Sequence, residues 1–278
     1  MRDLDALASR LQAAPAVLVR VSCAQGSVPR EVGAWMAVWP ADQVGTVGGG
    51  QLEWQALARA RQALASGTVL ADEVRYPLGP SLAQCCGGVA WLSFETVAAS
   101  DWPALQQRLA APQSTVALFG GGHVGQAIVR LLADLPLDVL WVDSRDGVFP
   151  QPMPAHVRCE HSDPVQAAVA DVLPGSRVVV MSFSHAEDFE IIAACLHRQR
   201  ARGDLPYIGL IGSSTKWASF QRRLRDRGFA PGELARVTCP IGVPGIGGKQ
   251  PAVVAVAVVA QLLQCDAAGA LEASKDQA

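Results

Sequence analysis

The sequence predicts an α/β protein, in which a smaller α+β domain precedes a C-terminal Rossmann-like domain with a parallel sheet and helices on both faces. Three observations predict this fold. The apolar run 116–119 leads directly into three glycines and then into an amphipathic helix pattern. Strand-like runs alternate with helix patterns from there to residue 227, which is typical of a parallel sheet. The first hundred residues instead combine two helix patterns with four strand-like runs.

Length and composition set the domain plan. A chain of 278 residues, half of them hydrophobic, is long enough for two domains and apolar enough for a large core. We expect an N-terminal domain over residues 1–99, a linker over residues 100–113 made of a short helix and a Pro/Gln stretch, and the Rossmann-like domain over residues 114–278.

Charge and apolar patterning bear on partners and location. The net charge of −2 leaves no basic excess for electrostatic binding to nucleic acid. The N-terminus lacks the apolar region of a signal peptide, and the apolar run 252–263 is too short to span a bilayer. Seven cysteines without an export signal are expected to be reduced thiols, which favours a cytoplasmic protein without membrane partners. The run 252–263 is expected to form a buried or interface helix, which favours a homodimer.

The elements of the first domain follow from apolar spacing and turn residues. Leu4, Leu7 and Leu11 share one face of an expected helix. Polar segments punctuated by Gly and Pro separate the strand-like runs. The expected helices cover 4–13 and 51–65, and the expected strands cover 16–23, 35–39, 69–76 and 89–97.

The second domain opens with the strand 116–119 and continues by alternation. Asp163 followed by Pro164 favours a helix start with Pro at its first position. Further strands are expected at 139–142, 156–160, 177–182 and 206–211. Further helices are expected at 124–135, 164–173 and 184–200, and one more ends at Arg227.

The turn after the first of these strands carries the chemistry. Gly120, Gly122 and Gly125 fit the pattern G-x-G-x-x-G, and Asp143 ends the next strand 23 residues after Gly120. In such a turn the second glycine lets a phosphate approach the backbone, and the helix start offers free N–H groups to an anion. His123 lies inside the loop, and Asp143 can accept a hydrogen bond from a ribose hydroxyl. The alternative is a tight turn whose site is empty.

Small-residue loops also precede other helix patterns, at Gly48 to Gly50, at Gly212 to Ser214 and at Gly245 to Lys249. Each can hold an anion or can simply start a helix. Lys249 does not make a Walker A loop, because Gln250 replaces the required Ser or Thr.

Thiols and histidines supply the other candidates. Cys85 and Cys86 precede two glycines, so a thiol there is expected to be accessible and activated by backbone N–H groups. Cys239 is a second thiol candidate, and His185 after the third strand is a candidate acid/base residue. The spacing of His and Cys residues near 156–161 matches no zinc pattern, so no metal site of protein ligands alone is predicted.

These motifs together resemble the XdhC/CoxI family, the accessory proteins of xanthine dehydrogenase and related molybdenum hydroxylases. The likeness covers nearly the whole chain. Gly121 stands where alanine is common, and Cys85 doubles the usual single cysteine. The matching segments are Gly26 to Gly33, Gly45 to Glu53, Cys86 to Gly88, Phe119 to Gly125, Val142 to Arg145, Gly209 to Ser213 with Lys216, and Cys239 to Gly242.

The resemblance implies a chaperone rather than a self-contained enzyme. Such a protein would bind the molybdenum cofactor (molybdopterin), protect it, support its sulfuration by a cysteine desulfurase and insert it into a xanthine dehydrogenase-type molybdoenzyme. Glycine loops suit the cofactor's phosphate, and a reduced thiol, Cys86 or Cys85, can lie near molybdenum. Glu53 is a candidate proton carrier or pterin-binding carboxylate. The expected cleft between the domains is lined by Gly48, Gly49, Gly50, Cys86, the loop from Gly120 to Gly125, and Asp143.

Two alternatives use the same residues differently. An NAD-dependent oxidoreductase would bind NAD through the glycine loop and Asp143, although Arg145 blurs the preference for NAD over NADP, and would use His185 for proton transfer. A pure scaffold would keep the fold with a vestigial site.

Overall fold

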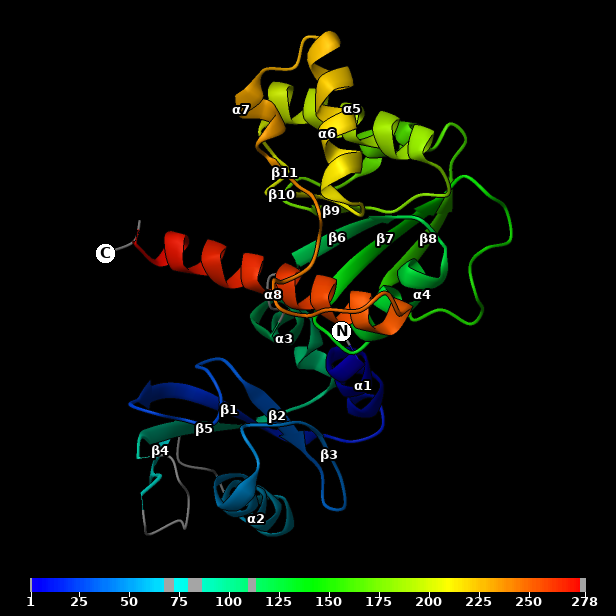
Figure 1. The fold of residues 1–278 in the computed structure, drawn as a ribbon. Coiled ribbons are helices and arrows are strands. Elements are labelled where there is room, and N and C mark those ends of the chain that lie inside the picture. The colour runs from blue at the N-terminus through cyan, green and yellow to red at the C-terminus, as the bar shows by residue number, and fades with distance from the viewer. Residues whose placement is uncertain (1, 68–72, 80–86, 110–113, 276–278) are drawn as a thin grey trace. The chain divides into compact units, whose positions relative to one another are not determined.

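The computed structural model describes residues 2–67, 73–79, 87–109 and 114–275, with only the backbone described over 266–275. The chain divides into two compact units, Met1–Pro112 and Gln113–Ala278. Figure 1 shows the elements of each unit.

The first unit is built on a five-stranded antiparallel sheet with the order β3-β2-β1-β5-β4. Its strands are β1 (Ala16–Gln25), β2 (Trp35–Val38), β3 (Gln43–Gly45), β4 (Glu73–Pro77) and β5 (Val89–Val97). Its helices are α1 (Arg2–Leu11), α2 (Gly50–Ser66), the 3-10 turn η2 (Ala99–Asp101) and α3 (Trp102–Leu109).

Helices cover both faces of this sheet, because the central strand β1 is apolar on both. Val17 and Val19 point to the face covered by α2, which contributes Leu52 and Ala56 to the same core. Leu18 points to the opposite face, which α1 and α3 cover. Figure 1 shows α2 on one side of the sheet and α1 with α3 on the other.

The second unit is a six-stranded, fully parallel sheet with the order β11-β10-β9-β6-β7-β8. Counted from β8 in order of appearance, this is the 3-2-1-4-5-6 order of a Rossmann fold. The strands are β6 (Ser114–Phe119), β7 (Leu137–Asp143), β8 (Val157–His161), β9 (Arg177–Val180), β10 (Tyr207–Leu210) and β11 (Val237–Thr238). The helices are α4 (His123–Leu132), η3 (Val165–Asp171), α5 (His185–Arg202), α6 (Ser214–Asp226), α7 (Pro231–Leu234) and α8 (Pro251–Lys275).

Two cores enclose this sheet, as the predicted fold class requires. Helices α4 and α8 pack with Val116 and Leu118 on one face. On the other face, η3, α5 and α6 pack with Ala117 and Phe119. The strand order reverses between β6 and β9, so the loops after these two strands meet at the carboxyl edge of the sheet, where such folds bind ligands.

Several details differ from the sequence predictions. The helix expected over 164–173 is the 3-10 helix η3 (Val165–Asp171), and Pro164, expected at its first position, is instead its extended N-cap residue (ψ 140°). The short helix expected within the linker 100–113 is present as α3, and its buried residues Leu105 and Leu109 pack into the core of the first unit. Residues 110–113, and residues 69–72 of one expected strand, lie outside the described residues.

Among the described residues, no helix is both long and apolar enough to cross a membrane. The C-terminal helix α8 instead packs along α4, burying Ala255, Val258 and Leu262.

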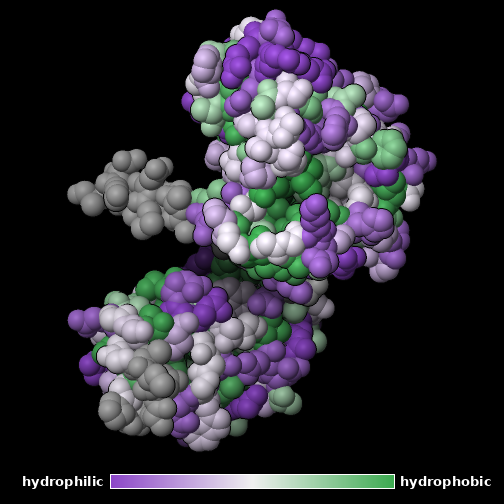
Figure 2. Space-filling model, in the orientation of Figure 1, coloured by the Kyte–Doolittle hydropathy of each residue, from purple (hydrophilic) through white to green (hydrophobic). Residues whose placement is uncertain are grey.

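Arg222, Arg223 and Arg225 of α6 are exposed. Figure 2 shows a hydrophilic surface at the end of the second unit to which α6 belongs. Arg227 forms a bidentate ion pair with Glu190 of α5. The guanidinium of Arg223 lies 3.8 Å from the centre of the Phe189 ring. This surface is therefore the outer face of an amphipathic helix that is fastened to α5.

Close backbone packing at the first turn of α4 yields a stability prediction. An added Cβ at Gly125 would lie 2.0 Å from the carbonyl oxygen of Gly120. We expect Gly125→Ala to lower the free energy of unfolding by about 1–3 kcal/mol, because the helix must move away from the strand loop. Urea denaturation followed by circular dichroism measures the change.

Gly232 in α7 offers a matched control, because a Cβ there would meet nothing within 4 Å. Gly232→Ala is expected to be neutral or stabilising by up to about 1 kcal/mol. Equal denaturation midpoints for the two variants would contradict the close packing of β6 and α4.

Candidate functional site

The glycine loop between β6 and α4 has the geometry of a phosphate-binding turn. Gly120 has a φ of 127°, and a Cβ there would lie 2.0 Å from the Met181 carbonyl oxygen, so only glycine fits beside β9. Gly125 packs against Gly120 from the helix side. A Cβ at Gly122 would meet nothing within 4 Å. Gly120 and Gly125 are thus needed for close backbone packing, whereas Gly122 leaves open space beside the loop.

Asp143 ends β7 and is almost fully buried, with 2% of its surface exposed. Its Oδ2 accepts hydrogen bonds from the Gly121 amide (2.6 Å) and from Nη2 of Arg145 (2.9 Å). Its Oδ1 accepts from the Arg145 amide (2.8 Å) and from Nε of Arg145 (2.9 Å). Both oxygens are therefore engaged within the protein, and the ribose contact predicted for Asp143 is not the role that this geometry gives it.

These contacts also fix the charge of the carboxyl group. Burial raises the pKa of Asp143, but hydrogen bonds from Arg145 and the Gly121 amide outweigh burial and hold this pKa below its ordinary value. The same pairing raises the pKa of Arg145. The pair is an ionised carboxylate bound to a guanidinium, with the Arg145 side chain 36% exposed.

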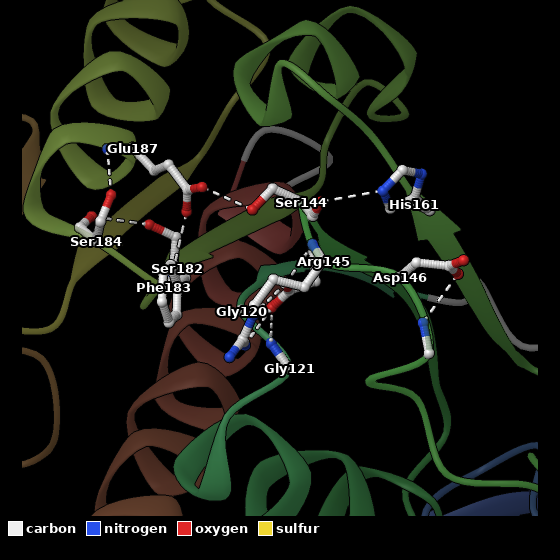
Figure 3. Close-up of polar contacts among 12 residues, drawn as sticks. Gly120, Gly121, Ser144, Arg145, Asp146, His161, Ser182, Phe183, Ser184 and Glu187 are labelled. Carbon is white, nitrogen blue, oxygen red and sulfur yellow. Dashed lines mark hydrogen bonds and ion pairs between the residues drawn. The ribbon is translucent and has the colours of Figure 1, made fainter.

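Two further carboxylates, Glu187 and Asp188, bind residues of the neighbouring loops at this edge. Figure 3 shows Glu187 with Ser144. Glu187 at the start of α5 accepts from the Ser144 hydroxyl (2.6 Å) after β7 and from the Phe183 amide (3.2 Å) after β9. Asp188 accepts from the amide (2.8 Å) and hydroxyl (2.7 Å) of Ser182. Nζ of Lys216 also donates to Asp188 (2.6 Å), so α6 is tied to the β9 loop.

The helix starts at this edge differ in how they are capped. The Ser184 hydroxyl accepts from an amide at the start of α5, and the Ser213 hydroxyl does the same for α6. Gly122, the N-cap residue of α4, makes no side-chain cap. His123 follows it and is exposed. Of these three starts, α4 is therefore the one whose N–H groups no cap side chain covers.

The side chain of Glu53 holds the glycine loop of the first unit in place through hydrogen bonds. The Oε2 atom of Glu53 accepts from the amides of Val47 (3.1 Å) and Gly49 (3.2 Å), and also from the Thr46 hydroxyl. Its Oε1 accepts from the side-chain amide of Gln43 (3.1 Å). Burial raises the pKa of Glu53, but these hydrogen bonds outweigh burial, and the pKa lies below its ordinary value. Glu53 therefore stays ionised and organises the Gly48 to Gly50 loop, which does not suit the predicted role of proton carrier.

The motif loops of the first unit contact one another. A Cβ at Gly48 would lie 2.4 Å from Cβ of Pro29, and the Gly88 amide donates to the Ser27 carbonyl (3.1 Å). The segment from Gly26 to Gly33 thus lies between Gly48 and Gly88. A cavity of about 370 Å³ adjoins it, with Arg30, Trp35 and Thr46 among its lining residues. Cys85 and Cys86, which come directly before Gly87 and Gly88 in the chain, lie outside the described residues.

The remaining candidates are dispersed. Cys239 follows β11, half-buried, with its Sγ 3.8 Å from the Gly212 carbonyl oxygen, and burial raises the pKa of its thiol. His185 is the first residue of α5 and is exposed. The structure groups Gly120, Gly122, His123, Gly125 and Asp143 in the second unit and places Gly48, Gly49 and Gly50 in the first.

Sequence reasoning missed the partners of the acidic residues. Arg145 follows Asp143 by two residues, close enough for a side-chain fork onto the same carboxylate. The Asp188–Lys216 ion pair joins residues 28 apart, so no local pattern announces it. For the first pair, the signal available in the sequence was a basic residue two positions after the acid that ends the strand.

The hydrogen bonds between Glu53 and the Gly48 to Gly50 loop lead to a second prediction. We expect Glu53→Gln to lower the free energy of unfolding near neutral pH by about 1–3 kcal/mol, because hydrogen bonds to a charged acceptor are lost. The folded-state pKa lies below the ordinary 4.5, so the carboxylate stabilises the fold above that pH. This contribution disappears as the pH falls through the folded-state pKa. Urea denaturation at about pH 7 and about pH 4 should show the difference from wild type shrinking in acid.

Glu73→Gln serves as the control for this change. Glu73 is an exposed carboxylate on the same sheet that accepts one hydrogen bond, from Ser22. Its substitution should change stability by less than about 0.5 kcal/mol. An equal effect of the two substitutions would mean that the Glu53 contacts do not hold the loop.

Family models match segments of both units. A family model described as the XdhC Rossmann domain matches residues 116–262, and one described as the XdhC and CoxI family matches residues 9–76. The uncharacterized protein YqeB of Escherichia coli K12 is 28% identical over 258 residues, which are 91% of this chain and 44% of YqeB, so the chain spans less than half of that relative. A crystal structure described as a xanthine dehydrogenase (BH1974) from Bacillus halodurans shares the fold, with a TM-score of 0.76 and 19% identity over 96% of each chain. The chain belongs to the XdhC and CoxI family.

Proposed function

We propose that this chain is an accessory protein that binds the molybdenum cofactor, protects it while it is sulfurated and inserts it into a molybdenum hydroxylase. The observation that carries the proposal is the uncapped start of α4 at the switch point of the parallel sheet. Gly122 leaves open space there, and the adjoining acid is already neutralised by Arg145. A helix start of this kind is a site for a phosphate-bearing ligand.

The chemistry of the cargo fits these residues. The molybdenum cofactor is a pterin with a phosphate, and its metal is held by dithiolene sulfurs. The Gly122 amide and the α4 dipole suit the phosphate, while Asp143, turned inward, does not repel it. A soft metal or a transferable sulfur needs a reduced thiol. We assign that role to Cys86 or Cys85, with Cys239 at the carboxyl edge of the sheet as a second thiol.

Family membership supports the choice of partners. The XdhC and CoxI family supports an accessory role toward a xanthine dehydrogenase-type enzyme. On this account the chain receives sulfur from a cysteine desulfurase, works as a homodimer in the cytoplasm and hands the loaded cofactor to the apoenzyme. The protein itself supplies binding, orientation and shielding from water rather than turnover.

A second candidate function is an NAD-dependent oxidoreductase, favoured by the Rossmann strand order and the three glycines. Two observations weigh against it. Asp143 has no free oxygen for a ribose hydroxyl, and His185 is an exposed residue at a helix start. Binding of NAD therefore serves as the parallel arm of the test.

Cofactor retention tests the proposal. Molybdenum cofactor released from a donor enzyme is added to the full chain under reducing, anaerobic conditions, and retained pterin is quantified by fluorescence after gel filtration and oxidation. We expect about stoichiometric retention by wild type. Gly122→Val should reduce retention at least about tenfold, because its side chain fills the space that the phosphate needs.

Two variants keep this result interpretable. Gly232→Val in α7 adds the same side chain away from the site and should retain the cofactor. Cys86→Ser should bind cofactor but deliver less sulfurated cofactor to an apo-hydroxylase. No pterin retention by wild type, combined with saturable NAD binding, would replace this proposal with the oxidoreductase.

A further inference from the structure

Arg145 is held in one orientation beside the glycine loop. Its Nε and Nη2 atoms form a fork onto the Asp143 carboxylate, at 2.9 Å each. The ring of Phe183 covers its guanidinium, 4.6 Å from the ring centre. Among the described residues, its Nη1 atom has no hydrogen-bond partner, and the side chain remains 36% exposed. The guanidinium therefore presents a fixed, unused donor edge.

This donor edge lies close to the open start of α4. Oδ2 of Asp143 accepts from both the Gly121 amide and Nη2 of Arg145, so the loop backbone and the guanidinium lie within two hydrogen bonds of each other. Gly122, the next residue, has open space beside it. One small anion can therefore meet the helix start and the guanidinium together.

Because Arg145 and Gly121 occupy the oxygens of Asp143, this carboxylate is not available to accept a hydrogen bond from a ligand. In Rossmann folds that bind NAD, the acid after the second strand accepts from the ribose 2′-hydroxyl, and a nearby Arg instead receives a 2′-phosphate. Here all four hydrogen bonds of Asp143 come from Gly121 and Arg145. A ribose hydroxyl would meet a guanidinium in place of a carboxylate.

We propose that Arg145, oriented by Asp143 and Phe183, is the specificity-determining residue of this site and selects a ligand that carries a phosphomonoester over one that presents a ribose diol. The inference rests on the proposed function only in placing a phosphate-bearing ligand at the glycine loop. A phosphomonoester can come from a pterin cofactor or from the 2′-phosphate of a dinucleotide, and the guanidinium recognises either.

Matched ligands test Arg145 without the molybdenum cofactor. Isothermal titration calorimetry of the full chain compares inorganic phosphate, NADP and NAD, because the two dinucleotides differ only in the 2′-phosphate. We expect millimolar or tighter phosphate binding that Arg145→Ala weakens at least about tenfold, as for loss of a charge-assisted hydrogen bond. Arg158→Ala removes an equally charged side chain from β8 that is 64% exposed, and it should bind phosphate like wild type.

Each outcome is decisive. Tighter binding of NADP than NAD, lost in Arg145→Ala, identifies a dinucleotide phosphate as the source. Arg145-dependent phosphate binding without preference between the dinucleotides supports a phosphomonoester that is not part of a nucleotide. NAD binding as tight as NADP binding without Arg145-dependent phosphate binding would overturn the inference, as would absence of both phosphate and NADP binding by the folded wild-type chain. Failure of cofactor retention alone would leave this result standing.

Discussion

The buried carboxylate of Asp143 is the interaction on which the carboxyl edge of the second unit depends. It joins the loop after β6 to the loop after β7 through Gly121 and Arg145, with 2% of its surface exposed. A charge so deeply buried is tolerated only when its oxygens are hydrogen-bonded, as both oxygens of Asp143 are here. The position of the glycine loop, the inward turn of the acid and the outward edge of the guanidinium all follow from this one group.

The same device recurs at other motif loops. Glu53 gathers the amides of the Gly48 to Gly50 loop, Glu187 joins the loops after β7 and β9, and Asp188 binds Lys216. In each case an acid beside a strand end or helix start satisfies backbone or side-chain donors of its own protein. These four acids are therefore part of the scaffold. Among the described residues at the carboxyl edge of the second unit, the start of α4 and Nη1 of Arg145 are donors that bind no side chain or backbone acceptor. A site made of donors suits an anionic cargo and does not require proton transfer.

Features that depend on neighbouring residues in the sequence could be predicted, and features that depend on contacts formed in the fold could not. The β6 strand, the three glycines and Asp143 were predictable because apolar runs, close packing and spacing are written in adjacent residues. The hydrogen-bond partners of Asp143 were not predictable in the same way. A strand-end acid in such a motif suggests a ligand acceptor, but here Arg145, two residues later, donates to it. The contacts of Glu53 were not predictable for the same reason, since its donors include backbone amides of the loop, which every sequence contains. The helix expected at 164–173 is a 3-10 helix with Pro164 as its extended N-cap residue, although the buried residues Val165, Ala168 and Val169 have the spacing that predicts an α-helix. The thiol predicted at Cys86 stays a prediction.

The most direct measurement is a crystal structure of the full chain grown anaerobically with molybdenum cofactor, with anomalous data collected at the molybdenum absorption edge. The anomalous peak locates the metal, and the surrounding density locates the phosphate. The account predicts an ordered molybdenum peak and a phosphate that contacts the Gly122 amide and Nη1 of Arg145, while Asp143 keeps its bonds to Gly121 and Arg145. An ordered cofactor elsewhere in the chain, or an Asp143 carboxylate turned out to a ribose hydroxyl, would contradict it.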